Sequence, residues 1–343
     1  MFKRFCVECG HILPETANFC YNCGVKIVST TNSYMQKYEY NIPCNELWYT
    51  SINEDVVCPY IEDFGANIIS NSYQNGLGKI IFNKSVSHIG NDVFHFRKNL
   101  KSIIIPNKVI YIGKRSFNGC VNLDCIDIPD SLNSIGEEAF AFCSSLKEIT
   151  IPDSVMHVGE NIFCDCTSLS SIHSKFSSTD KRCLIIDSTL NSFARAGLKE
   201  YVIPNGVTSI GREVFQHCNK LTSITIPDSV IKIEEFAFNE CTSLYSINFG
   251  NNISNIDGAA FMGCESLRTI NIPKSVAIIG TGAFCGCSSL TSIFMHSMPN
   301  GNDAMFCNNA DGRKIYVPKS LIMRFREAKY WSIYKYSIVG YEL

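Results

Sequence analysis

Apolar residues recur along this chain with a period of 23 residues, and each recurrence begins at a leucine. The spacing is 23 throughout, except for 29 between Leu169 and Leu198. A fixed repeat of this length predicts a solenoid, in which each unit buries its apolar face only against its neighbours. The leading leucines are Leu77, Leu100, Leu123, Leu146, Leu169, Leu198, Leu221, Leu244, Leu267 and Leu290.

Each unit contains two short apolar segments followed by an aromatic one. It opens with LxxIxIP, and the alternation seen at Ile103 and Ile105 predicts a short strand with one buried face. Proline often follows and ends that strand, since it lacks an N–H. A second pair, such as Val109 and Ile112, predicts a second short strand, and the glycine that usually follows suits a tight bend.

The unit closes with a phenylalanine and then a cysteine three residues later, as at Phe117 and Cys120. That gap predicts one turn of helix with both side chains on the same face. One coil is therefore expected to be strand, bend, short strand, bend and helical turn. Stacked coils of this kind predict parallel sheets with strands about 4.8 Å apart.

Seven of the eighteen cysteines occupy the closing position of the repeat: Cys120, Cys143, Cys166, Cys218, Cys241, Cys264 and Cys287. Stacked in a column, their Cα atoms come within disulfide range, but nearly parallel Cβ vectors disfavour bridging. A long chain with a generous apolar core is not a disulfide scaffold, so we expect reduced, buried thiols. The extra cysteines of the pairs Cys164/Cys166 and Cys285/Cys287 are interpreted as chance neighbours rather than metal ligands.

The pattern LxxIxIPxSVxxIGxxAFxxC resembles the leucine-rich repeats of the BspA-like family. The resemblance runs from about residue 45 to the C-terminus. Residues 45–76 look like the segment that opens the family's solenoids, 176–197 like its interrupted repeat, and 315–342 like its C-terminal cap. The resemblance implies a protein-binding or surface-recognition solenoid. Members are often secreted adhesins of host-associated bacteria and of some parasitic protists.

The N-terminus carries a different pattern, CVECGHILPETANFCYNC, which spaces its cysteines as C-x2-C-x10-C-x2-C. Cys6, Cys9, Cys20 and Cys23 can offer four thiolates to one Zn²⁺, which favours a tetrahedral sulfur shell. Two disulfides or an iron site are the alternatives. The segment resembles short bacterial zinc ribbons. A filled shell leaves no site for substrate, so the zinc is expected to be structural and to supply folding energy.

Composition and charge narrow the class of protein. The chain has 343 residues, 45% of them hydrophobic and 18% charged, which suits a folded core. Its net charge of −2 gives no electrostatic argument for nucleic acid or an anionic membrane. No apolar run is long enough to cross a bilayer, and MFKRF is not followed by the apolar stretch of a signal peptide. We therefore predict a cytoplasmic location, with the cell surface as the alternative.

The predicted fold is a β-rich α/β solenoid of leucine-rich repeats, with parallel sheets and a 23-residue period, preceded by a small zinc ribbon. The expected boundaries are a ribbon at 1–27, a linker at 28–44, an N-terminal cap of the solenoid at 45–76, the repeats at 77–314 and a C-terminal cap at 315–343. The repeat at 169–197 is interrupted.

The candidate site is the outward side of the first strand of each coil, because GxxxxGK[ST], HExxH and GxSxG are all absent. Small polar residues gather there and could bind an extended partner by many weak contacts. The alternative is that Ser and Thr simply suit solvated strands. The candidate residues are Ser102, Asp127, Glu148, Thr150, His173, Glu200, Ser223, Thr225, Ser246, Asn248, Thr269 and Asn271.

These features predict a non-enzymatic scaffold that binds another protein, a host or surface component being among the candidates, and not nucleic acid. The zinc ribbon would be structural or a second docking module. One alternative is a BspA-like adhesin, surface-exposed or secreted without a conventional signal peptide. Another is an enzyme or regulator whose site crosses the junction of ribbon and solenoid.

Overall fold

A computed structural model describes residues 4–5, 12–13, 42–302 and 304–342. The chain divides into two compact units, Met1–Pro43 and Cys44–Leu343. In the first unit, β1 (Arg4–Phe5) pairs with β2 (Ile12–Leu13) in an antiparallel manner. The four cysteines of the predicted zinc ribbon, Cys6, Cys9, Cys20 and Cys23, lie outside the described residues.

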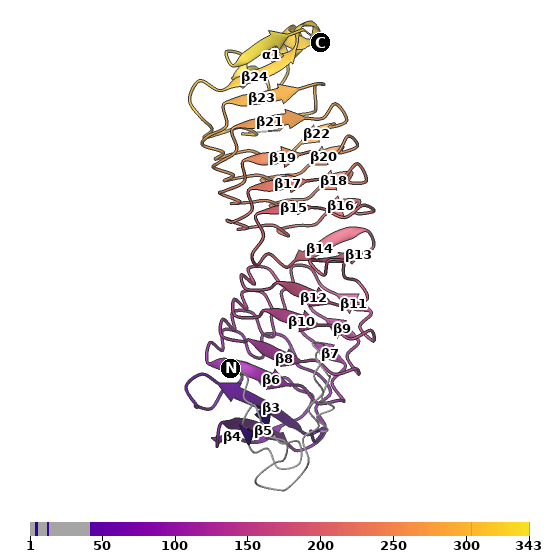
Figure 1. The fold of residues 1–343 in the computed structure, drawn as a ribbon, viewed down its shortest axis with the longest axis vertical. Coiled ribbons are helices and arrows are strands. Elements are labelled where there is room, and N and C mark those ends of the chain that lie inside the picture. The colour runs from indigo at the N-terminus through magenta and orange to yellow at the C-terminus, as the bar shows by residue number, and fades with distance from the viewer. Residues whose placement is uncertain (1–3, 6–11, 14–41, 303, 343) are drawn as a thin grey trace. The chain divides into compact units, whose positions relative to one another are not determined.

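The second unit is a stack of coils, each with two short strands (Figure 1). Register partners such as Ile149 and Ile172, or Ile224 and Ile247, are 23 residues apart, which confirms the predicted solenoid with parallel sheets. The first strands are β6 (Leu100–Ile104), β8 (Cys125–Asp127), β10 (Glu148–Thr150), β12 (Ser171–His173), β15 (Glu200–Val202), β17 (Ser223–Thr225), β19 (Ser246–Asn248), β21 (Thr269–Ile272) and β23 (Ser292–Met295).

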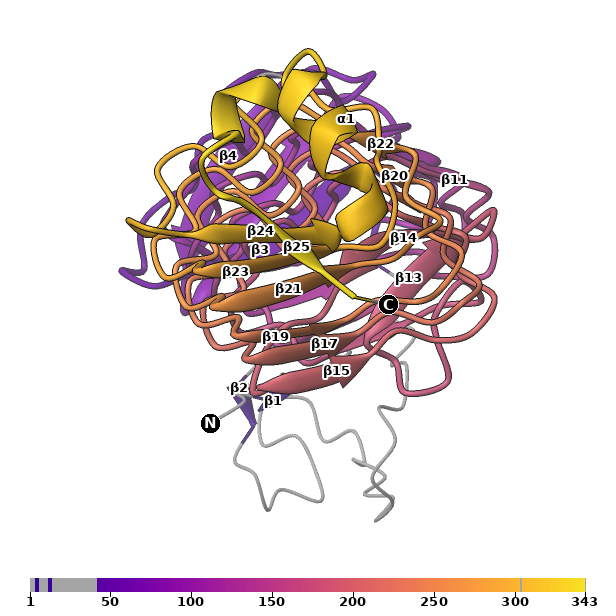
Figure 2. The same ribbon diagram turned by 90° about the horizontal axis from the view of Figure 1, so that it is seen from above.

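The second strands of the coils are only two residues long and follow an adjoining side of the stack (Figure 2). All but β11 bury an isoleucine, and paired strands place these isoleucines opposite one another, as at Ile233 and Ile256. They are β7 (Tyr111–Ile112), β9 (Ser134–Ile135), β11 (His157–Val158), β16 (Ser209–Ile210), β18 (Lys232–Ile233), β20 (Asn255–Ile256) and β22 (Ile278–Ile279).

The end of each coil is a run of turns, so the predicted turn of helix is wrong. Glu138 and Phe142 have φ angles of 54° and 61°, which no α-helix contains. These left-handed residues break the helical hydrogen-bond pattern, and alternate N–H groups instead reach the next coil. Phe117 donates to the carbonyl of Ala139 over 2.8 Å, and Gly119 to that of Ala141 over 2.9 Å. The turns therefore form a third connection between coils.

The core is built around a column of phenylalanine rings that stack from coil to coil. The centroids of Phe117 and Phe140 are 5.4 Å apart, and those of Phe215 and Phe238 are 4.8 Å apart. All four rings are fully buried, as the apolar pattern predicts. The buried residues fall into two clusters that meet at the interrupted repeat, so the solenoid has two cores.

The seven periodic cysteines are buried and free, which confirms their predicted state. Six of them share a contact that explains why the position holds cysteine. The Cys143 thiol donates to the carbonyl of Phe117 over 3.2 Å, and the same bond recurs in other coils. Burial raises the pKa of Cys120 and of Cys166 to about 12, so the thiols remain protonated donors. The six cysteines are Cys120, Cys143, Cys166, Cys241, Cys264 and Cys287.

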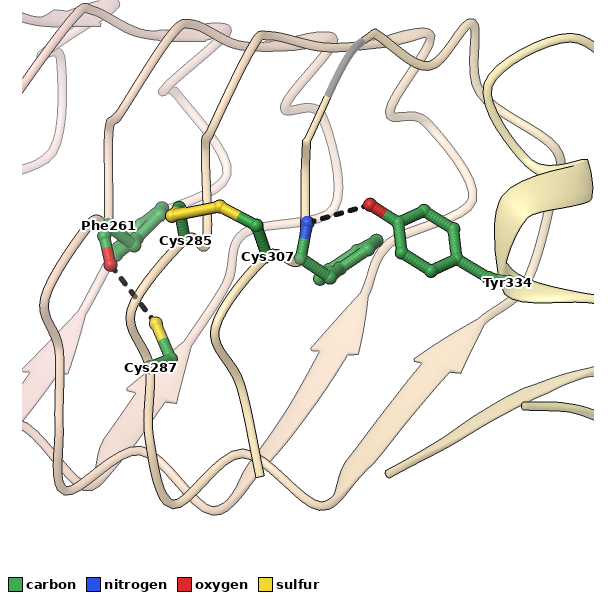
Figure 3. Close-up of a disulfide and its surroundings, with 6 residues drawn as sticks. Phe261, Cys285, Cys287, Cys307 and Tyr334 are labelled. Carbon is green, nitrogen blue, oxygen red and sulfur yellow. Dashed lines mark hydrogen bonds between the residues drawn. A yellow bond between two sulfur atoms is a disulfide. The ribbon is translucent and has the colours of Figure 1, made fainter. Parts of the chain in front are cut away.

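The general expectation of reduced thiols is wrong at one place outside the periodic column, where Cys285 and Cys307 form a disulfide (Figure 3). The last coil is one residue short, because Phe306 stacks on Phe284, 22 residues away. This shift brings Cys307 beside Cys285, with their Cα atoms 4.6 Å apart. Cys285 is therefore not a chance neighbour of Cys287.

The interrupted repeat contains an antiparallel hairpin of β13 (Cys183–Ile186) and β14 (Thr189–Phe193). The hairpin joins the second-strand side, where β14 pairs with β16 in parallel. On the first-strand side, the described residues show no pairing between β12 and β15. The described residues show no pairing between β11 and the hairpin either, so both parallel sheets are interrupted between Leu169 and Leu198.

Both ends of the stack are covered. At the N-terminal end, β3 (Glu46–Ser51) inserts antiparallel between β5 (Leu77–Phe82) and β6, and β4 (Ile68–Gln74) flanks β5. The first coil therefore reaches the sheet through β3 and not by parallel pairing with β6. At the other end, β24 (Lys314–Pro318) and β25 (Ile338–Tyr341) extend the sheet, and η1 (Lys319–Leu321), α1 (Ile322–Glu327) and η2 (Ser332–Tyr334) lie over the last coil (Figure 2).

Candidate interaction surface

The twelve predicted site residues all lie on first strands, and none of them is buried. Strand alternation explains this, since Ile149 points into the core while Glu148 and Thr150 on either side point outward. Seven are exposed: Glu148, Thr150, His173, Glu200, Asn248, Thr269 and Asn271. Five are half-buried: Ser102, Asp127, Ser223, Thr225 and Ser246.

The parallel register arranges these side chains in rows. Glu200, Ser223 and Ser246 stand opposite one another on β15, β17 and β19. Thr225 stands opposite Asn248 in a second row. Neighbours in a row are one strand spacing apart, about 4.8 Å. The rows therefore offer hydroxyl and amide groups at a regular interval along the stack.

Pairing among the described first strands also lapses between β8 and β10 and between β19 and β21. Only between β12 and β15 do the two core clusters also separate, so the rows are divided there into two surfaces. The N-terminal strand face consists of Ser102, Asp127, Glu148, Thr150 and His173. The C-terminal strand face consists of Glu200, Ser223, Thr225, Ser246, Asn248, Thr269 and Asn271. Sequence reasoning treated all twelve as one surface, because periodicity alone does not show where pairing stops.

The two faces differ in charge and in free hydrogen-bonding groups. The N-terminal strand face has two carboxylates, Asp127 and Glu148, and its Ser102 hydroxyl lies 2.6 Å from the hydroxyl of Thr50. Ser102 is therefore already engaged within the fold. The C-terminal strand face has a single charged residue, Glu200, and consists otherwise of hydroxyl and amide groups. It is suited to hydrogen bonding rather than to ion pairing.

Aromatic residues outside the twelve predicted site residues extend the C-terminal strand face toward the cap. Phe294 stands opposite Asn271 and stacks on Tyr316 with ring centroids 4.7 Å apart. His296 lies between Asn271, 2.6 Å from its Oδ1, and the hydroxyl of Tyr341, 2.8 Å away. The alternation of the segment KIYVP could have indicated that the sheet continues there.

The densest ionic cluster lies at the interruption and serves the fold. Asp165 accepts a hydrogen bond from Arg195 over 2.9 Å, and its other oxygen lies 2.9 Å from Nδ1 of His217. Nε2 of His217 is 3.3 Å from Glu240. Burial raises the pKa of the neighbouring Cys164, so this thiol is not an activated nucleophile. The cluster joins the coils on either side of the hairpin.

The described residues contain no group of three or more His, Cys, Asp or Glu side chains placed to hold a metal ion. Likewise, none of the described helices is long and apolar enough to span a membrane. Polar rows on a stack of coils define a leucine-rich repeat solenoid, a fold that generally serves as a non-catalytic scaffold.

The sequence profile of the BspA type leucine-rich repeat region matches residues 66–183 and 186–322 in six copies. The chain therefore belongs to this family. The match confirms the resemblance seen in the repeats, and it does not reach the predicted zinc ribbon.

Solved structures show similar solenoids. A leucine rich cell surface protein from Faecalibacterium prausnitzii is 30% identical, with a TM-score of 0.61 over 68% of this chain and 63% of that chain. This chain thus spans less than two thirds of that relative. The pneumococcal vaccine antigen PcpA is 22% identical, with a TM-score of 0.61 over 75% of this chain and 70% of that chain, and shows the shared fold. Comparison with curated protein sequences gave no significant match.

Proposed function

We propose that this chain is a non-enzymatic scaffold that binds another protein through the C-terminal strand face. The observation that supports this most directly is the pair of rows of hydroxyl and amide groups on β17 and β19, which Glu200 on β15 continues and parallel pairing holds in register. Such a lattice can hydrogen-bond to an extended segment of a partner at several coils at once. Many weak contacts then add up to specific binding.

The aromatic extension strengthens the choice of this face over the N-terminal one. Aromatic residues are enriched at the centres of protein interfaces. Phe294 and Tyr316 stack at the end of the rows, next to Asn271. The N-terminal strand face has two carboxylates and an engaged Ser102, and its flanking aromatic residue, Trp48 on β3, already has the Lys79 ammonium 4.4 Å from its ring centroid.

Binding can be tested by affinity capture with the full chain and two variants. Thr225→Lys/Asn248→Lys places two long charged side chains on the C-terminal strand face. Asn205→Lys/Ser288→Lys adds the same charge at exposed positions off the strands. The proposal expects a captured protein to be lost with the first variant and retained with the second. Equal capture by both variants would refute this choice of face.

The N-terminal cysteines are proposed to hold one structural Zn²⁺. The antiparallel pairing of Arg4 with Leu13 and of Phe5 with Ile12 supports this, because Cys6 and Cys9 lie between these two strands in the sequence. Four thiolates are the ligands of many structural zinc sites. Metal analysis of purified protein should give about one zinc per chain, and Cys6→Ser should lose it. Zinc-free protein with an unchanged, folded N-terminal unit would contradict the assignment.

A second candidate, an adhesin exposed at the cell surface, is favoured by two observations. The Faecalibacterium relative is described as a cell surface protein. The Cys285–Cys307 disulfide suits an oxidising compartment. The cytoplasmic location is favoured by the proposed thiolate zinc site, because a reducing compartment keeps cysteines unbridged. Protease treatment of intact cells separates the two, because a surface protein is degraded and a cytoplasmic one is protected.

A further inference from the structure

The outer side of the C-terminal cap exposes large apolar side chains. Met323 of α1 is 62% exposed, Ile333 of η2 is 65% exposed, and Tyr336 is 86% exposed. Tyr336 is the most exposed large hydrophobic residue in the part of the chain that the structure describes. A folded protein in water gains nothing by presenting three such groups on one short segment, so they indicate a contact with something apolar.

These groups face away from the solenoid because their neighbours in sequence face toward it. Phe325, Trp331 and Tyr334 are buried, and the Trp331 indole donates to the carbonyl of Pro299 over 3.0 Å. The rings of Phe325 and Trp331 are 4.8 Å apart, which packs α1 against the turn before η2. Met323, Ile333 and Tyr336 are each within two residues of one of these buried side chains and are themselves exposed. No described element of the second unit covers α1 there (Figure 2).

The same segment concentrates positive charge. Residues 319–342 contain five Lys or Arg and two Glu, a net charge of +3, with Lys319 paired to Glu342. The whole chain carries −2, so the remainder carries −5. Arg324 and Lys335 are exposed beside the apolar side chains. The net charge of the whole chain gave no argument for an anionic partner. It does not reflect the basic region at the C-terminal end.

We propose that Met323, Arg324, Ile333, Lys335 and Tyr336 form a cap outer face that docks on an anionic lipid bilayer. Apolar side chains enter the boundary between headgroups and acyl chains, while lysine and arginine attract anionic headgroups. A bilayer offers acyl chains and anionic headgroups over one flat area. This arrangement suits a surface on which apolar and basic side chains alternate along short turns. This role is separate from partner binding by the strand faces and needs no spanning helix.

Vesicle co-sedimentation of the full chain tests the proposal. Wild-type protein should sediment with vesicles of phosphatidylglycerol and phosphatidylcholine, but not with phosphatidylcholine alone, and less as salt is raised. Arg324→Gln/Lys335→Gln should weaken the partition coefficient more than tenfold, because each basic residue contributes about fivefold. Met323→Ser/Ile333→Ser/Tyr336→Ser should weaken it at least as much. The control Lys108→Gln/Lys220→Gln removes the same charge from exposed positions in other coils and should bind as wild type does.

Thermal denaturation of each variant shows that it is folded before its binding is compared. The proposal is overturned if wild-type protein stays in solution with anionic vesicles, or if the control loses as much binding as the cap variants. It is also overturned if the serine variant binds normally while polyphosphate competes. That result would indicate a site for anionic polymers in place of a bilayer contact.

Discussion

Two phenylalanines, two residues apart, show how differently one residue type is used within a coil. Phe140 is fully buried in the ring column, and Phe140→Ala should cost about 3–5 kcal/mol through the cavity it leaves. Phe142 is 45% exposed with a φ of 61°, and glycine holds the same position in other coils, as at Gly119 and Gly263. Phe142→Gly should therefore be neutral or stabilise by about 1 kcal/mol. Urea unfolding measures the unfolding free energy of both variants. A similar loss of stability in the two would contradict the different roles assigned to Phe140 and Phe142.

The sequence predicted the burial of Phe140 but not the conformation of Phe142. Apolar periodicity reports which side chains face the core, whereas the sign of φ depends on local backbone geometry. The glycines at the equivalent positions, Gly119, Gly263 and Gly286, were the available signal. The prediction of a helical turn used only the three-residue gap between phenylalanine and cysteine and not these glycines.

The buried thiols make stability depend on alkaline pH. The pKa of Cys120 and of Cys166 is raised to about 12, from an ordinary value of 9.0. The folded state therefore keeps protons that the unfolded state releases, and stability is full below pH 9 and falls as pH rises toward 12. The loss is about 1.4 kcal/mol per pH unit for each thiol. Urea midpoints between pH 7 and 10.5 should fall less steeply for Cys120→Ala/Cys166→Ala.

The exposed Cys58 gives the matched control for this titration. Cys58→Ala should follow the wild-type pH dependence, because the thiol is in water in both states. A double variant with the wild-type slope would show that lysine or tyrosine titration dominates and that the periodic thiols do not couple to unfolding.

At the scale of elements, the last coil is held by a covalent link that the repeat pattern concealed. Cys285 and Cys307 are 22 residues apart, one fewer than the period, so a strict 23-residue count does not place them opposite each other in the stack. The stacking of Phe306 on Phe284 shows that the last coil is the one that lacks a residue. The hairpin of β13 and β14 was likewise predicted only as an interruption. Tertiary pairing, and not local sequence, decides which sheet such short strands join.

Removing this link should loosen the C-terminal coils. Closing a loop of 22 residues by a disulfide stabilises by about 3 kcal/mol in the chain-entropy view. Cys285→Ser/Cys307→Ser should lower the unfolding free energy of the C-terminal core by that amount. A reducing agent should have the same effect on wild-type protein and none on the double variant. If reductant leaves wild-type stability unchanged, the two cysteines are free in solution.

At the scale of the whole solenoid, the interruption divides both the core and the candidate site. The strand faces were predicted residue by residue, because alternation along a strand fixes which side chains point outward. Their separation into two surfaces was not predicted, since it depends on β12 and β15 failing to pair. The two hydrophobic clusters divide at the same place. Repeat proteins gain stability from neighbouring coils only, so the halves can unfold separately where the contact between them is weakest.

Hydrogen exchange can measure that independence. Phe117→Ala should speed exchange in coils before the interruption, and Phe238→Ala in coils after it, because each ring belongs to a different core. The bonds of Asp165 to Arg195 and His217 are among the polar contacts that couple the halves, together with the bond from Asn161 to Glu213. Asp165→Asn weakens the bonds of Asp165. The exchange rates of the two halves should therefore differ more than in wild-type protein, while each half stays protected. Faster exchange along the entire stack in Phe117→Ala would instead show a single cooperative unit, in which the two strand faces could not respond independently to a bound partner.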